Sequence, residues 1–489
     1  MLTGATMSLT SPDTRPSRGR VAVALLAASL PMFMATLDNL VITSALPVIR
    51  ADLGATLEHL QWFVNAYTLT FATLMLGAST LGDRFGRRRL FVSGISLFTL
   101  ASIGSALATT PAMLIGARAL QGVGGAAIMP LSLTLLAAAV PKAQRAMAIG
   151  VWGGVAGLGV AIGPLIGGAV VEGVSWQAIF WINVPIALVA VPLVLRALPE
   201  SYGRREPLDV AGLVLVGAGV LATVWGIVRG NDDGWTSTPV LGALILGGLL
   251  LVAFVVRESR APHPLVPLRL FRSRSFTIAN VAGFGFSLGM FGAVFLLVQY
   301  LQVVQGYSPL EAGVRTLPWT AAPMVVAPIA GLLAPRVGVR ALLSTGLALQ
   351  AAGLAWIALA TGPGSTYAGL VPAFVLAGVG MGLTFAPSST AVLADMAEAD
   401  HATASSTNAT LREIGVALGV AVLVAVFEGA GGTVTPTGYA DALRPAVLTG
   451  AAVVALAALA ARWLPRHART VSTLDSAAED DAPLAPALT

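Results

Sequence analysis

Fourteen runs of mainly apolar residues, each long enough to cross a bilayer as a helix, follow one another along the chain. A bilayer core about 30 Å thick needs roughly 20 residues of helix. The runs lie at about 21–47, 60–82, 90–109, 112–138, 146–170, 178–198, 208–228, 239–256, 278–304, 314–334, 341–361, 369–394, 409–428 and 442–463. We therefore expect an all-α integral membrane protein with fourteen transmembrane helices.

Composition supports this reading. Only 10% of the residues are charged, whereas a soluble domain carries roughly 25%. This excludes a soluble enzyme, a nucleic-acid-binding protein and a disordered scaffold. The absence of cysteine excludes a disulfide-rich module and any metal site built on cysteine, and the four histidines fall in predicted loops or tails and suggest no metal site.

The two central runs are the ones that a twelve-span interpretation would place in a loop. The stretches Val210 to Val228 and Val240 to Val256 contain no charge, which a loop in water has no reason to show. We therefore expect a cytoplasmic tail at 1–20, a six-helix bundle at 21–198, and a linker at 199–277 that contains two extra helices at about 208–228 and 239–256. A second six-helix bundle at 278–463 and a disordered cytoplasmic tail at 464–489 complete the chain.

The basic residues predict the orientation. Most of the 28 lysines and arginines fall in segments on the same side as the N-terminus, as the positive-inside rule requires of cytoplasmic loops. Both termini are therefore expected in the cytoplasm, and the net charge of +5 reflects topology rather than nucleic-acid binding.

A weak internal repeat relates the two predicted bundles. The segment from Leu81 to Arg88 has a counterpart from Leu333 to Arg340, and the stretch from Gly122 to Pro130 recurs between Gly378 and Pro387. Two parallel halves are typical of transporters, with the substrate cavity between them. Chance similarity between Gly- and Ala-rich helices is the alternative.

Asp38 and Arg118 are the ionisable residues placed deepest in predicted spans. Asp38 lies ~13 Å and Arg118 ~9 Å from the same membrane face, at 1.5 Å per residue. We expect both to face a cavity, where Arg118 would control whether Asp38 holds a proton. The alternative is an ion pair that only holds two helices together.

The fifth run contains a dense glycine pattern made of Gly159, Gly163, Pro164, Gly167 and Gly168. Small residues at this spacing allow backbones to approach closely, and the proline removes a helix hydrogen bond. We expect this segment to pack closely against a helix of the other half and to seal the protein against leak. Simple helix packing is the alternative.

Two further groups carry charge at predicted helix ends. A candidate gating loop contains one acid among arginines. Asp83 in this loop could stabilise one conformation by pairing with arginine or with a helix N-terminus. The alternative is that the charges of the loop only fix its position on the cytoplasmic side of the membrane. The loop residues are Asp83, Arg84, Gly86, Arg87 and Arg88. Arg412 and Glu413 in the thirteenth run are candidates for proton coupling or substrate contact, or for an interfacial pair.

Some polar and aromatic residues are candidates to line the cavity. Amides recur at helical spacing near one end of the ninth run, and the second run opens with aromatic residues that could equally form an interfacial belt. The candidates are Trp62, Tyr67, Gln121, Gln299 and Gln302.

These motifs resemble the fourteen-span drug:proton antiporters of the major facilitator superfamily over nearly the whole chain. The resemblance rests on Leu37 to Pro47, Gln61 to Tyr67, Asp83 to Arg88, Arg118 to Gly122, Gly159 to Gly168, Trp176 to Pro185, Gln299 to Pro309 and Leu411 to Gly415. Two departures are Ser79, where glycine is usual, and Pro335, which replaces an acid in the second loop copy.

The resemblance implies a bacterial plasma-membrane transporter, not an enzyme, that confers antibiotic resistance by multidrug efflux. It would export hydrophobic compounds, cationic ones included, in exchange for protons, with no cofactor beyond the proton-motive force. We expect rocker-switch alternating access in a protein that functions as a monomer surrounded by lipid. A lipid or metabolite exporter or flippase of the same fold is the alternative, and an importer, a membrane-embedded enzyme and a passive structural protein fit the motifs less well.

Overall fold

The computed structural model describes residues 18–203, 207–362, 364–397 and 400–465, and these contain helices but no strands. The predicted tails at 1–20 and 464–489 lie almost entirely outside the described residues. The first half of the chain forms α1 (Arg18–Leu53), α2 (Leu57–Phe85), α3 (Arg87–Ala106), α4 (Pro111–Ala139), α5 (Lys142–Gly173), α6 (Ala178–Trp181) and α7 (Asn183–Ala197).

The extra pair and the second half follow. The pair is α8 (Val210–Asp233) and α9 (Thr238–Glu258), and the short 3-10 helix η1 (Leu268–Arg272) comes next. The second half is formed by α10 (Arg274–Val303), α11 (Pro309–Thr320), α12 (Ala322–Val337), α13 (Val339–Ala360), α14 (Tyr367–Leu393), α15 (His401–Gly429) and α16 (Pro436–Ala461).

Each of the fourteen predicted runs corresponds to a helix or to a pair of consecutive helices. Thirteen of these segments, among the described residues, are long and apolar enough to cross a membrane. The remaining one is α2, a 29-residue helix that is less apolar along its length. The chain is therefore a multi-pass membrane protein.

Two of the predicted spans are interrupted, which the apolar pattern did not predict. The sixth is divided at Ile182 and the tenth at Ala321. Proline has no N–H and cannot bond the carbonyl four residues earlier. Pro185 and Pro323 follow the two breaks closely, so each leaves a carbonyl of the preceding turn without its helical partner.

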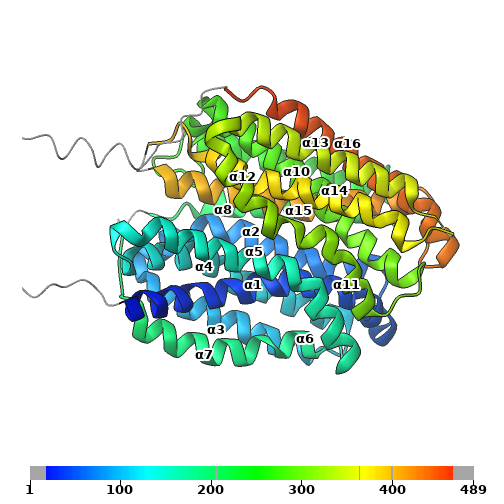
Figure 1. Cartoon of the computed structure of the whole chain (residues 1–489), viewed down its shortest axis with the longest axis horizontal. Coiled ribbons are helices and arrows are strands. Elements are labelled where there is room, and N and C mark those ends of the chain that lie inside the picture. Colours follow the sequence, from blue (N-terminus) through cyan, green and yellow to red (C-terminus); the bar gives the residue numbers. More distant parts are fainter. Residues whose placement is uncertain (1–17, 204–206, 363, 398–399, 466–489) are drawn as a thin grey trace, which may run out of the picture.

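Helices from the two halves form two layers, one of α1 to α7 and one of α10 to α16, and α11 of the second layer reaches across to α5 and is drawn beside the helices of the first (Figure 1). Matching capping boxes begin α2 and α11, the second helices of the two halves. Thr56 and His59 cap α2, and Ser308 and Glu311 cap α11. These equivalent helix starts lie 252 residues apart, the same spacing as the repeated loop in the sequence.

The two layers meet along two seams. In one seam α2 packs against α15, and α8 of the extra pair contacts both of them. Leu76, Val220 and Ala417, from these three helices, share one apolar cluster. In the other seam α5 packs against α11. We call the end of the molecule where α1 begins and α16 ends the tail end, and the end where α5 ends and α11 begins the far end (Figure 1).

Candidate functional site

Asp38 is bound on both of its carboxylate oxygens inside the N-terminal layer. Arg118 on α4 forms an ion pair with Oδ2. Gln121, one turn further along α4, and Asn183, the first residue of α7, each donate to Oδ1 at 2.8 Å. Asp38 is 4% exposed and Arg118 0%. The two residues predicted to lie at matched depth are therefore in direct contact, and both are closed off from solvent.

The guanidinium of Arg118 is held from several directions. Its Nε donates to the carbonyl of Phe63 at 3.1 Å, and its NH1 also donates to Gln121. The ring of Tyr67 lies 4.4 Å from the guanidinium carbon, a cation–π contact that is strongest where water is excluded. These contacts fix the orientation of the guanidinium against the carboxylate of Asp38.

Asn183 is a site residue that we did not single out from the sequence. Its Nδ2 donates to Asp38 and also to the hydroxyl of Ser102 at 2.9 Å. Ser102 in turn donates to the carbonyl of Phe180 at 2.8 Å. Both hydrogens of the amide are thereby used, which fixes its orientation. The available signal was an amide inside an apolar run, within the stretch from Trp176 to Pro185.

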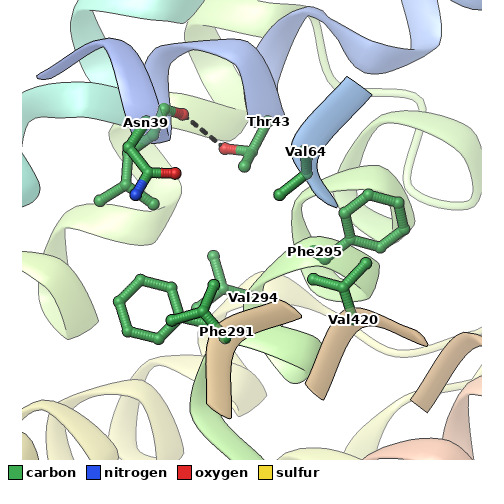
Figure 2. A pocket seen from close by; sticks show the side chains of 9 residues that line it. Asn39, Thr43, Val64, Phe291, Val294, Phe295 and Val420 are labelled. Atoms are coloured by element: carbon green, nitrogen blue, oxygen red, sulfur yellow. Dashed lines mark hydrogen bonds between the residues drawn. The ribbon is translucent and has the colours of Figure 1, made fainter. Parts of the chain in front are cut away.

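A small pocket lies beside this network, between the two layers (Figure 2). Asn39 and Thr43 of α1 line one side, and Phe291 and Phe295 of α10 line the opposite side. The hydroxyl of Thr43 donates to the carbonyl of Leu40 at 2.7 Å. The remaining lining residues are Leu40, Val64, Val294, Val416 and Val420. The lining is thus mainly apolar, and in this conformation the space is smaller than a drug-sized molecule needs.

The predicted cavity residues occupy other places. Tyr67 and Gln121 belong to the buried network around Asp38 and Arg118. Trp62 packs against the cluster formed by α2, α8 and α15. Gln299 donates to Phe295 within its own helix at 2.9 Å, whereas Gln302 crosses between the layers and donates to the carbonyl of Ser44 at 3.0 Å.

The glycine pattern of α5 packs on two helices at once. Gly159, Gly163 and Gly167 face α1, where an added Cβ would lie 2.7 Å from the Cβ of Leu40 at the middle position. Gly168 faces the other layer and has no room for a Cβ beside the carbonyl of Pro309. The carbonyl of Pro164 likewise occupies the space beside Gly313. The sequence predicted close approach to a helix of the other half, and α11 is the helix in that position.

The gating-loop residues interact within the N-terminal layer. Arg87 donates to Asp83 at 2.6 Å, four residues earlier. Glu200 accepts from the backbone N–H groups of Arg88 and Arg89 at the start of α3. Gly86 joins α2 to α3 with a φ of 106°, a conformation that favours glycine. Arg88 donates to the carbonyls of Leu195 and Leu198, and Arg84 lies over the ring of Phe85.

Arg412 and Glu413 lie half-buried on α15. The guanidinium of Arg412 lies 4.8 Å from the ring of Phe385. Oε2 of Glu413 is buried without a hydrogen-bond partner among the described residues. Val416 and Val420 of the pocket follow three and seven residues later, so Glu413 shares their helix face. Such a carboxylate is suited to bind a proton or a cation.

Comparison with known proteins gives a consistent result. The model of the Major Facilitator Superfamily matches residues 28–420. The tetracenomycin C resistance and export protein of Streptomyces glaucescens is 35% identical over 467 residues, which cover 93% of this chain and 86% of that protein. The cephamycin export protein of Amycolatopsis lactamdurans is 37% identical, over 91% of this chain and 93% of that one.

Two further similarities concern a pump and a solved structure. A multidrug efflux pump of Mycolicibacterium smegmatis is 35% identical over 85% of this chain and 82% of its own length. The crystal structure of a POT family transporter, in complex with a thioalcohol-conjugated peptide, has a TM-score of 0.68 and 15% identity. It covers 90% of this chain and 94% of that one, and at this identity it shows a shared fold.

Proposed function

Because the chain belongs to the Major Facilitator Superfamily, we propose that it exports hydrophobic antibiotics or drugs, cationic ones included, in exchange for protons. The curated relatives described above are named for export or efflux of such compounds. The observation that carries proton coupling is the carboxylate of Asp38, buried in a membrane span against Arg118. Ionisable residues in such places are costly and usually functional.

The proposed cycle exchanges a proton for substrate at Asp38. With the ion pair formed, Asp38 is ionised and held by Arg118, Gln121 and Asn183. Protonation weakens these bonds, and substrate in the neighbouring pocket favours return to the ionised form. One proton moving through 100 mV supplies ~2.3 kcal/mol. Glu413 lies beside the pocket, and its Oε2 accepts no hydrogen bond from the part of the chain that the structure describes. It is a second candidate to bind a proton or a cationic substrate, and Arg412 would balance its charge.

Alternation follows from the two layers rocking about the pocket. The glycine segment from Gly159 to Gly168 closes the far end against α11, and Asp83 with its arginine neighbours stabilises the tail end. Arginines gather at the tail end, in the loop after α2 and around η1. By the positive-inside rule this end faces the cytoplasm, in a bacterial plasma membrane where a single copy works surrounded by lipid.

Efflux from energised vesicles tests the proposal. We expect inverted vesicles with a proton gradient to accumulate ethidium, as a cationic probe, or a neutral aromatic antibiotic, and the Asp38→Asn variant to fall to background. Asp441 carries an exposed carboxylate on α16, so the Asp441→Asn variant is the matched control and should transport normally. Full accumulation by Asp38→Asn would overturn the proposal, and movement of a fluorescent phospholipid alone would favour a lipid exporter.

A further inference from the structure

We infer that Glu172 is a positioning residue that latches the far end of the transporter closed. Glu172 is the penultimate residue of α5, and its Oε2 accepts a hydrogen bond from the backbone N–H of Leu310 at 3.1 Å. Leu310 lies in the first turn of α11, in the other layer. The first N–H groups of a helix lack partners within that helix and favour negative charge. Glu172 of the N-terminal layer therefore binds a free N–H group at the start of α11, a helix of the other layer.

The position of this contact in the seam is what makes it a latch. Gly168 meets the carbonyl of Pro309, and one turn deeper Pro164 meets Gly313. Below these, the hydroxyl of Thr320 donates to the carbonyl of Ala161 at 2.9 Å. Glu172 lies one turn beyond Gly168, at the outermost level. The deeper contacts bring backbones together without charge, whereas the outermost one is a charged, exposed hydrogen bond.

A second observation separates Glu172 from ordinary helix capping. The start of α11 already has a complete capping box, in which Glu311 accepts from the N–H of Ser308 at 3.0 Å and Ser308 accepts from that of Glu311. Both carboxylates stand at the same helix terminus and both are exposed. Glu311 belongs to α11 itself, so its bond survives when the layers part. The bond of Glu172 has to break.

A single cysteine in the seam provides the test, because the natural chain has none. Thr316 is 4% exposed and lies on α11 one turn from Thr320, on the same face. A membrane-impermeant maleimide added at the far end can modify the cysteine of Thr316→Cys only when that end opens. The modification rate therefore follows the fraction of molecules that are open at the far end. The measurement needs neither substrate nor a proton gradient. The latch proposal can therefore be contradicted while the proposed drug export is confirmed, and the reverse is also possible.

We expect Glu172→Leu to raise the modification rate about two- to fivefold, from the strength of charge–helix contacts. Glu172→Gln should raise it less, because its amide oxygen still accepts a hydrogen bond. Glu311→Gln, the matched control, should leave the rate unchanged. An unchanged rate in Glu172→Leu, or an equal rise in Glu311→Gln, would overturn the latch.

A reporter inside the N-terminal layer separates latch release from general loosening. Ser105 on α3 is fully buried, and its hydroxyl has no hydrogen-bond partner among the described residues, so cysteine replaces it with little change. The latch predicts that Glu172→Leu leaves the modification rate of Ser105→Cys unaltered. A parallel rise at both reporters would show that Glu172 only supports folding, and would overturn the proposal.

Discussion

The two layers share a helical plan but differ in what they bury. In the N-terminal layer, α1 and α4 bury Asp38 against Arg118. When α4 and α14 are aligned by their starting residues, Phe374 takes the place of Arg118. Phe374 stacks on Trp319 with ring centroids 6.0 Å apart. The sequence of α10 contains no charge after Arg274.

The C-terminal layer instead buries a neutral amide pair. Asn408 on α15 donates to Asn280 on α10 at 3.1 Å. The two layers thus share a helical plan while their buried chemistry differs. The N-terminal layer carries the buried ion pair, and α10 of the C-terminal layer supplies the aromatic wall of the pocket.

Breaking the ion pair should have the largest effect on stability. Asp38→Asn leaves the guanidinium of Arg118 buried without its counter-ion, and removal of one partner from a buried pair costs about 3–5 kcal/mol. Denaturant unfolding in detergent measures this loss. The double variant Asp38→Asn/Arg118→Gln removes both charges and should recover most of it. If the double variant were less stable than the single one, the cost would not arise from an unpaired charge.

The corresponding change in the C-terminal layer gives a stability loss with which that of Asp38→Asn can be compared. Asn408→Leu leaves the side-chain oxygen of Asn280 without its donor, which costs about 1–3 kcal/mol. The loss should therefore be smaller than for Asp38→Asn. Equal losses in the two layers would contradict the asymmetry between charged and neutral networks.

The smallest expected effect belongs to an exposed ion pair at the tail end. Arg269 donates to both oxygens of Asp400 at 2.6 Å, and this hydrogen bonding holds the pKa of Asp400 below its ordinary value. A carboxyl group with a lowered pKa stabilises the fold above its unfolded pKa, and this contribution is lost as pH falls through the folded pKa.

Asp400→Asn should therefore cost at most about 1 kcal/mol at neutral pH, because exposed pairs contribute little. The difference from the natural protein should vanish in acid, which unfolding followed from pH 7 downward would measure. Asp395→Asn is the control, since the hydroxyl of Ser273 donates to Asp395 at 3.1 Å. A difference for Asp400→Asn that persisted in acid would exclude the ion pair as its source.

The number of spans and the pairing of Asp38 with Arg118 could be anticipated from the sequence. Both rest on one-dimensional quantities, the length of apolar runs and the depth of a residue along its helix. Depth alone, however, does not specify the rotation of a helix about its axis. The donation from Asn183 to Asp38 depends on that rotation, and so does the placement of Gln121 within the network rather than in the pocket.

Contacts between the layers were harder to predict because they depend on how the two layers pack against each other. Close packing by Gly168 could be expected from its lack of a side chain. The hydrogen bonds between Glu172 and α11 and between Gln302 and α1 could be predicted only with knowledge of which helix ends meet. The breaks at Ile182 and Ala321 were visible only as nearby prolines, whose effect depends on whether neighbouring groups bind the freed carbonyl.

Proton release on substrate binding tests the central claim that Asp38 exchanges a proton for substrate. Purified protein in weakly buffered detergent, given ethidium or a neutral aromatic antibiotic, should release up to about one proton per bound molecule, from those molecules in which Asp38 is protonated before binding and returns to its ionised form on binding. The Asp38→Asn variant should bind without release, while Asp441→Asn should match the natural protein. Undiminished proton release by Asp38→Asn would contradict the account.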